Sequence, residues 1–314
     1  MNRRSGLPVI ALLILAAVIA AAAAPAGRRF HKYSALGNDY IVLDPADWPE
    51  APPAELIRRI CDRHRGVGSD GILYGPTTKT EPFGLRLFNP DGSEFEKSGN
   101  GLRIFARYLW DRRLPTSRDY AIGTPGGKVI AHLLDADGSR IAMEMGKLSF
   151  DSRKIPVSGK PRDVLDEEVS IAERKLRIIA VTIGNPHCVV FIDGANAAAA
   201  REFGGLTREL AIALGPQLES LPLYPNKTNV QFAQVLDRHT IRMEIWERGA
   251  GYTLASGTSS CAAAGAAIRT GRCDSPVKVR MPGGELLVEI GKDWGAKLTG
   301  TVDPVCVGEL TFIK

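Results

Sequence analysis

Two stretches of the chain, Ser98-Gly99-Asn100-Gly101 and Ser256-Gly257-Thr258-Ser259, have the form that opens an α-helix. A helical pattern follows each of them, over residues 102–110 and 261–268. Each stretch also lies downstream of a glycine-containing loop. Two helix starts of the same kind in one chain indicate an internal repeat.

The signatures around these helix starts also occur twice, in the same order. Gly37-Asn38 and Gly184-Asn185 each precede an apolar run that ends at an aspartate, and a Pro-Gly-Gly triplet precedes strand-like residues 128–133 and again 285–290. The copies lie roughly 150 residues apart, far more than the period of a solenoid. We therefore expect two homologous domains that face each other across a cleft, which is a favoured place for a ligand.

Strands dominate each half of the repeat. Residues 86–88, 141–144 and 241–246 alternate or run apolar over strand lengths, and Gly and Pro-Gly pairs separate them. Mostly antiparallel strands with few helices predict an α+β fold. The length of 314 residues suits two domains, and the apolar and charged fractions of 44% and 24% are those of a globular protein.

Charge and cysteine content exclude several classes of function. The net charge is +5, and no block of like charges exceeds three residues, so we expect no nucleic-acid partner. The five cysteines are odd in number and form no C-x-x-C, which excludes a disulfide framework or zinc ribbon and favours a reducing compartment. The five histidines are scattered, so we expect no metal. Residues 66–71 match G-x-G-x-x-G with the helix and strand in reverse order, which excludes a dinucleotide fold.

The first 27 residues form a separate segment. Arg3 and Arg4 precede an apolar run over residues 7–24, and small residues follow at cleavage spacing. This pattern is typical of a secretory signal or a short membrane anchor, and it also fits an Ala-rich extension produced by a wrongly chosen start codon. We expect residues 1–28 to lie outside the folded body and the protein to be cytoplasmic. Export or anchoring through residues 1–27 is the alternative, with membrane contact only if residues 7–24 are an uncleaved anchor.

Both helix starts predict an anion site. The turn-rich loop over residues 89–97 runs into the first, and Glu247-Arg248-Gly249-Ala250-Gly251 precedes the second. Free N–H groups and the helix dipole at such points bind a carboxylate. Ser98 and Ser256 are equally explained as N-caps, but capping does not account for their matched contexts.

Two other polar residues stand out. His187, after the turn that begins at Gly184, is either a proton carrier, a neighbour that sets a pKa, or a structural histidine. Asn229 lies in an apolar context, where its amide needs a backbone or ligand partner.

The sequence resembles the diaminopimelate epimerase family from about residue 29 to residue 314, because several motifs of that family occur here in the same order. The motifs are Phe88-Asn-Pro-Asp-Gly-Ser93 with Ser98-Gly-Asn-Gly101, then Gly184-Asn-Pro-His187, then Glu247-Arg-Gly-Ala-Gly251. The resemblance implies two pseudo-symmetric domains, each a β-sheet curled around a central helix, with a C-terminal strand that returns to the first domain. Together with the ends of the repeated hairpins, it places residues 29–146 plus 301–314 in one domain and 147–300 in the other.

The resemblance also implies PLP-independent inversion at an amino-acid α-carbon, in lysine and peptidoglycan precursor synthesis, without a cofactor. A homodimer of this protein is compatible with the resemblance. The substrate contacts carried over are Asn38, Asn89, Asn185 and Asn229 as amide ligands, Gly99, Asn100, Gly257 and Thr258 as helix-start cradles, and Glu247 with Arg248 as an acid and base pair. His187 matches the histidine that tunes a catalytic thiol.

The sequence departs from the family at the catalytic positions. The family uses two cysteines on opposite faces of the α-carbon, where this chain has Ser98 and Ser256. A thiol has a free pKa of about 8.5, whereas a hydroxyl is a far weaker acid and needs a neighbouring base. By family position, His187 and Glu247 are the nearest candidates for the base that activates each serine. Three functions remain open: an active epimerase, a lyase such as one that dehydrates a hydroxy amino acid, and a catalytically inactive amino-acid-binding protein.

Overall fold

The structure of the protein, a computed structural model, describes residues 28–311. The predicted signal or anchor over residues 1–27 lies outside the described residues. The helices are α2 (Ala54–Cys61), α3 (Gly99–Asp111), η1 (Gly194–Asn196), α4 (Ala197–Arg201), α5 (Arg208–Glu219) and α6 (Gly257–Arg269). Across residues 28–311, no helix is both long and apolar enough to cross a membrane.

Strands outnumber helices in the described chain. The strands of the first half are β1 (Arg28–Ala35), β2 (Asn38–Leu43), β3 (Ile72–Tyr74), β4 (Phe83–Gly84), β5 (Arg86–Phe88), β6 (Glu94–Phe95), β7 (Asp119–Thr124), β8 (Gly127–Leu133) and β9 (Arg140–Lys147). Those that follow are β10 (Glu167–Ile171), β11 (Arg174–Thr182), β12 (Pro186–Phe191), β13 (Asn229–Asp237), β14 (Thr240–Glu247), β15 (Gly251–Thr253), β16 (Val277–Met281), β17 (Gly284–Ile290), β18 (Gly295–Thr301) and β19 (Asp303–Leu310).

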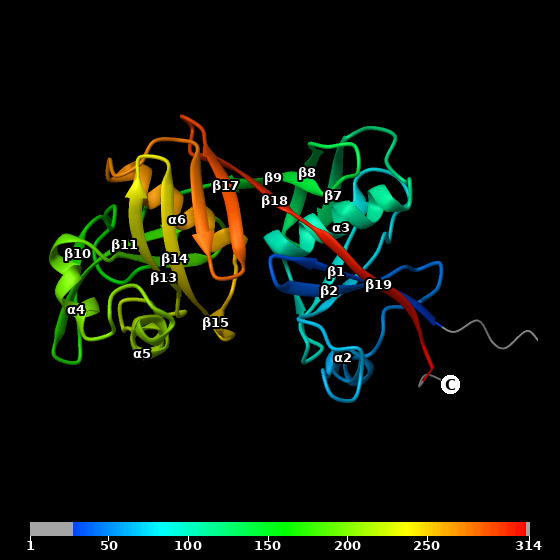
Figure 1. Cartoon of the computed structure of the whole chain (residues 1–314), viewed down its shortest axis with the longest axis horizontal. Helices are drawn as coiled ribbons and strands as arrows, with labels where there is room; N and C mark the ends of the chain where they lie inside the picture. Colours follow the sequence, from blue (N-terminus) through cyan, green and yellow to red (C-terminus); the bar gives the residue numbers. More distant parts are fainter. Residues whose placement is uncertain (1–27, 312–314) are drawn as a thin grey trace, which may run out of the picture.

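The strands form two sheets and the molecule has two lobes (Figure 1). The six-stranded sheet, in the order β19-β1-β2-β3-β5-β6, lies wholly in the lobe that contains α3. The 13-stranded sheet runs through both lobes, because β18 pairs antiparallel with β9 between them. The predicted fold class is confirmed: the protein is α+β, with two pseudo-symmetric domains.

The domain boundaries after residues 146 and 300 stay a proposal. They are supported by the strand pairing, since β9 and β18 are the strands that connect the lobes. After β18 the chain crosses to the first lobe, where β19 pairs antiparallel with β1 and places Leu310 opposite Arg28.

A helix of 13 residues sits at the centre of each lobe. In α3, Leu102, Phe105 and Tyr108 are among the side chains fully buried against β1, β2 and β9. In α6, a run of alanines fills the space between the strands of the second lobe. Both helices begin at the predicted helix starts, with Gly99 and Gly257 as first residues and the preceding serines as N-caps.

The two helix starts approach each other closely because each begins with glycine. A Cβ on Gly99 would lie 3.4 Å from the Cα of Gly257 and 3.0 Å from Met145 Cε. A Cβ on Gly257 would lie 2.9 Å from Leu298 Cδ2, which is too close for a real side chain. Glycine at these two positions therefore lets the starts of α3 and α6 come into close contact.

Candidate active site

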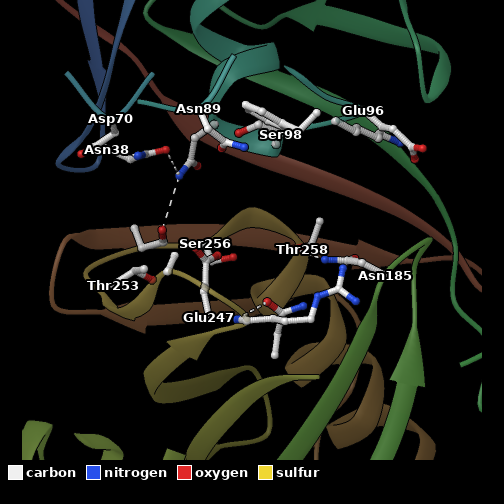
Figure 2. Close-up of a pocket in the computed structure, with 18 of the residues that line it drawn as sticks. Asn38, Asp70, Asn89, Glu96, Ser98, Asn185, Glu247, Thr253, Ser256 and Thr258 are labelled. Carbon is white, nitrogen blue, oxygen red and sulfur yellow. Dashed lines mark hydrogen bonds between the residues drawn. The ribbon is translucent and has the colours of Figure 1, made fainter. Parts of the chain in front are cut away.

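A cleft of about 1280 Å³ opens at the two helix starts. The predicted site residues that line it are Asn38, Asn89, Ser98, Gly99, Asn100, Asn185, Asn229, Glu247, Arg248, Ser256 and Thr258. Figure 2 shows Asn38, Asn89 and Ser98 facing Asn185, Glu247 and Ser256 across it. Gly257 and His187 do not line the cleft, and both are buried.

Ser98 is held by hydrogen bonds that it accepts. Its Oγ accepts the N–H of Gly101 at 3.1 Å, which makes it the N-cap of α3. The phenol of Tyr40 donates to the same Oγ at 3.5 Å. Burial raises the pKa of Tyr40, so the phenol keeps its proton at neutral pH. Ser98 therefore caps α3 and also lines the cleft, so both interpretations of this residue apply.

Ser256 has a different neighbour. It is 4% exposed, and its Oγ accepts the N–H of Ser259 at 3.4 Å as the N-cap of α6. The carboxylate of Glu247 lies close enough to the hydroxyl of Ser256 to act as a hydrogen-bonding neighbour. Burial raises the pKa of Glu247 and outweighs the opposite effect of this neighbour. A raised pKa brings a carboxylate closer to the range in which it exchanges protons at neutral pH.

The amides on the first side of the cleft form a fixed network. Asn100 Nδ2 donates to Asn38 Oδ1 at 3.0 Å, and Asn38 Nδ2 donates to Asp70 Oδ2 at 2.9 Å. Behind them, the buried Arg103 donates to Asn100 Oδ1 at 2.8 Å. Asn89 donates to Ser93 Oγ at 3.0 Å. The orientation of Asn38 and Asn100 in the cleft is therefore set before any ligand arrives.

On the second side, Asn229 uses its amide for the backbone. Its Nδ2 donates to Pro186 O at 2.9 Å, and its Oδ1 accepts the N–H of Arg248 at 3.0 Å. Asn229 thus fixes the backbone from which Arg248 extends. The guanidinium of Arg248 is exposed at the cleft and donates to Asn226 O at 3.2 Å.

His187 lies behind the cleft wall with no exposed surface. Burial lowers its pKa to about 3, so the imidazole is neutral at neutral pH. Its Nε2 lies 3.0 Å from Asn185 Oδ1, and Asn185 Nδ2 reaches Thr258 Oγ1 at 3.5 Å. Its contact with the cleft is therefore made through Asn185.

Several cleft residues were not among those predicted. Tyr40, Asp70 and Thr253 line the cleft, and the buried Oγ1 of Thr253 lacks a hydrogen bond within the described chain. Tyr40 was detectable, because it lies two residues after Asn38 on β2 and side chains at that spacing face the same side of a strand. Within residues 28–311, no group of three or more His, Cys, Asp or Glu side chains is arranged to hold a metal ion.

Comparison with known proteins places the chain in a family. The family model described as diaminopimelate epimerase matches residues 30–150 and 179–305. The chain belongs to the diaminopimelate epimerase family. The assignment confirms the resemblance seen in the sequence, and it makes the protein an epimerase, one of the isomerases.

Individual relatives agree with the assignment. A protein of Nostoc sp. named diaminopimelate epimerase 2 is 51% identical over 90% of this chain and 95% of its own length. The diaminopimelate epimerase of Moorella thermoacetica is 38% identical over 83% of this chain and 90% of its own length.

Solved structures share the fold at low sequence identity. A hydroxyproline epimerase from Agrobacterium vitis has a TM-score of 0.65 at 15% identity, and covers 91% of this chain and 93% of its own. A PhzF-family protein of Bacillus anthracis has a TM-score of 0.62 at 16% identity, and covers 90% of this chain and 99% of its own. These likenesses show that the two-domain architecture is shared.

Proposed function

We propose that this family member inverts the α-carbon of diaminopimelate without PLP, using Ser98 and Ser256 on the two faces of that carbon. The observation that carries the proposal is the convergence of both serines, each capping the central helix of its lobe, on one cleft. Its relatives named diaminopimelate epimerase support the choice of substrate.

The helix starts supply the site for the α-carboxylate. The first intrahelical bond of α3 runs from the N–H of Leu102 to Ser98 O, at 2.8 Å. The N–H groups of Gly99 and Asn100 precede it, and the positive end of the helix dipole adds to their attraction for an anion. Arg248 is placed to pair with a carboxylate of the ligand through two parallel hydrogen bonds.

The proton transfers follow from the neighbours of the serines. On one face, the α-proton passes to Ser256 Oγ while the hydroxyl proton of Ser256 passes to Glu247, and the electron pair left on carbon is delocalised into the α-carboxylate. On the other face, Ser98 gives its hydroxyl proton to the carbon, and Tyr40 returns a proton to Ser98. The raised pKa of Tyr40 makes this second transfer costly. We therefore expect slow epimerisation.

The test is incubation with diaminopimelate in D₂O. Deuterium at the α-carbon together with conversion between the stereoisomers is the expected result. Binding without any α-hydrogen exchange would overturn the proposal and leave an amino-acid-binding protein.

One observation favours a second function. Glu247 is a hydrogen-bonding neighbour of Ser256, whereas the phenol of Tyr40 is the hydrogen-bonding neighbour of Ser98. A single base is enough for a lyase that removes water from a hydroxy amino acid, because no proton has to be delivered to the opposite face. Loss of substrate with release of a dehydrated product, measured in the same D₂O incubations, would support this function over epimerisation.

We also propose a cytoplasmic location. Cys61, Cys188, Cys261 and Cys273 are buried as free thiols, and Cys306 is exposed as a free thiol. Such cysteines suit a reducing compartment. Cell fractionation with an antibody tests this, and recovery of the chain outside the cytoplasm would favour the alternative of export or anchoring through residues 1–27.

A further inference from the structure

His187 and Gln231 are buried polar neighbours behind the cleft wall. They stand on the neighbouring parallel strands β12 and β13, in which Val189 pairs with Gln231, and neither side chain has exposed surface. Gln231 is close enough to the imidazole to act as a hydrogen-bonding neighbour. As the two side chains are oriented, however, His187 Nδ1 and Gln231 Oε1 are both among the buried polar atoms of residues 28–311 that lack a hydrogen bond.

Other contacts extend this pair into a chain that begins and ends on α6. Gln231 Nε2 donates to Ser259 Oγ at 3.0 Å. In the other direction, His187 Nε2 lies 3.0 Å from Asn185 Oδ1, and Asn185 Nδ2 lies 3.5 Å from Thr258 Oγ1. Asn185 and Thr258 both line the cleft, so the buried pair is connected to the site through them.

A neutral imidazole has one hydrogen-bond donor and one acceptor. If every hydrogen bond in this chain of side chains is made, the donors can therefore point in only two directions along it, which we call its two polarities. In the first, His187 Nε2–H donates to Asn185 Oδ1, and the Gln231 amide is turned so that Nε2 donates to His187 Nδ1 while Oε1 accepts from the hydroxyl of Ser259. In the second, His187 Nδ1–H donates to Gln231 Oε1, and Asn185 is turned so that its Nδ2 donates to His187. Turning an amide exchanges atoms of almost equal size, so both are sterically open.

The two polarities give the cleft opposite chemistry. The first leaves the N–H group of Asn185 directed to the cleft, whereas the second leaves its carbonyl oxygen there. An oxygen beside the start of α6 would repel the carboxylate that this helix start attracts. The first polarity also keeps Asn185 as the structure places it, with Oδ1 toward His187 and Nδ2 toward Thr258.

We propose that the chain has the first polarity, so that His187 is a positioning residue whose Nε2–H tautomer makes Asn185 present an N–H donor to the substrate carboxylate. The proposal rests on the proposed function only for the presence of an amino-acid carboxylate in the cleft. Burial and the charge of Arg248 both lower the pKa of His187, which keeps the ring neutral and able to hold one tautomer. His187 therefore orients a ligand contact and does not carry the substrate proton.

The tautomer is measured by NMR of the full chain labelled with ¹⁵N-histidine, with the His187 signal assigned from a His187→Gln variant. The expected spectrum shows a neutral Nε2–H imidazole that does not titrate between about pH 8 and pH 5. An Nδ1–H tautomer, or titration near the ordinary value of about 6.5, would overturn the proposal. This measurement does not require turnover, so its failure is distinguishable from failure of the proposed function.

The polarity is tested by Gln231→Glu, whose carboxylate can only accept and therefore requires a proton on His187 Nδ1. At alkaline pH the neutral ring then has no proton on Nε2, Asn185 turns, and the Kd for diaminopimelate rises about tenfold relative to wild type, the loss of one hydrogen bond to a charged group. At acidic pH the doubly protonated ring restores Nε2–H, and the Kd returns toward that of wild type.

Unchanged affinity of Gln231→Glu at alkaline pH would overturn the proposal, because it would mean that the native ring already carries its proton on Nδ1. Gln234→Glu is the matched control, since Gln234 lies on the same strand without lining the cleft, and it should show neither effect. If Gln231→Glu does not fold, Gln231→Met serves instead. It removes the donor to Nδ1, so NMR should show both tautomers, and a single unchanged tautomer would count against the proposal.

Discussion

Ser98 and Ser256 occupy equivalent places in the two lobes, yet their neighbours have opposite proton chemistry. Each caps a helix of 13 residues, and each accepts an N–H from the first turn of that helix. Ser256 has Glu247, a carboxylate with a raised pKa, as a hydrogen-bonding neighbour, whereas Ser98 accepts a hydrogen bond from Tyr40, whose phenol keeps its proton. The symmetry of the backbone therefore does not extend to the acids and bases that serve the two serines.

This difference matters because epimerisation in the two directions requires each serine to act once as proton acceptor and once as proton donor. One serine must accept a proton and the other must deliver one, and the roles reverse for the opposite stereoisomer. Glu247 suits the accepting role at Ser256, and Tyr40 suits the delivering role at Ser98. In the reverse direction a phenolate would have to act as the base. The site is thus set for one direction of transfer, which limits the overall rate.

The largest effect is expected when both serines are replaced by cysteine. Thiolates at helix N-termini are available at neutral pH, so Ser98→Cys with Ser256→Cys should raise the rate of diaminopimelate epimerisation by about 100-fold or more. Between the single variants, Ser98→Cys should gain more, because the hydrogen-bonding neighbour of Ser98 is a phenol that keeps its proton. Steady-state rates compared with wild type test this. A double variant without any gain would mean that the cleft does not fit the substrate.

The next effect concerns the base beside Ser256. Glu247→Gln should lower α-hydrogen exchange by about 100-fold, since the amide cannot accept the proton. The ionised carboxylate is the active form, so activity falls as the pH drops through its pKa. Because burial raises that pKa, the acid limb of the pH profile should lie above the range of an ordinary glutamate, and it should vanish in the variant. Glu96→Gln removes a different carboxylate from the cleft lining and is the control. An equal loss in both variants would argue against a special role for Glu247.

A smaller effect on ligand binding is expected at Arg248, whose backbone Asn229 fixes. Arg248→Lys keeps the charge but loses the paired hydrogen-bond geometry, so the Kd for diaminopimelate should rise about tenfold. Calorimetry with Arg86→Lys as the control is suitable, since Arg86 pairs with Glu94 away from the cleft lining. Equal affinities for the wild type and Arg248→Lys would remove Arg248 from the binding site.

The repeat and the helix starts could be predicted from the sequence because their signals are local. Glycine, serine and the Pro-Gly-Gly turns impose particular backbone conformations wherever they occur. The neighbours of the serines could not be predicted in the same way. The spacing of Tyr40 from Asn38 indicates that it faces the cleft, but its contact with Ser98 joins residues 58 positions apart. His187 follows a turn at the cleft, and the strand that begins at Pro186 carries it behind the cleft wall. These features depend on how the elements pack.

The smallest expected effect separates the two sides of the cleft most directly. Tyr40→Phe removes one hydroxyl next to Ser98 and leaves Glu247 and Ser256 in place, so inversion should slow about five- to tenfold, the usual worth of one hydrogen bond. Exchange of the α-proton at the Ser256 face needs only Glu247 and should be nearly unchanged. The readout is the ratio of the inversion rate to the deuterium-exchange rate, measured in D₂O for the isomer whose exchange depends on Glu247. This ratio should fall in Tyr40→Phe, whereas Glu247→Gln should lower both rates together.

Tyr33→Phe is the matched control, because Tyr33 is a buried tyrosine on the adjacent strand whose hydroxyl donates to Asp111 at 3.0 Å, away from the cleft. If Tyr40→Phe lowered exchange and inversion equally, Tyr40 would stabilise the site as a whole, and the proposed division of an acid at Ser98 and a base at Ser256 would be wrong.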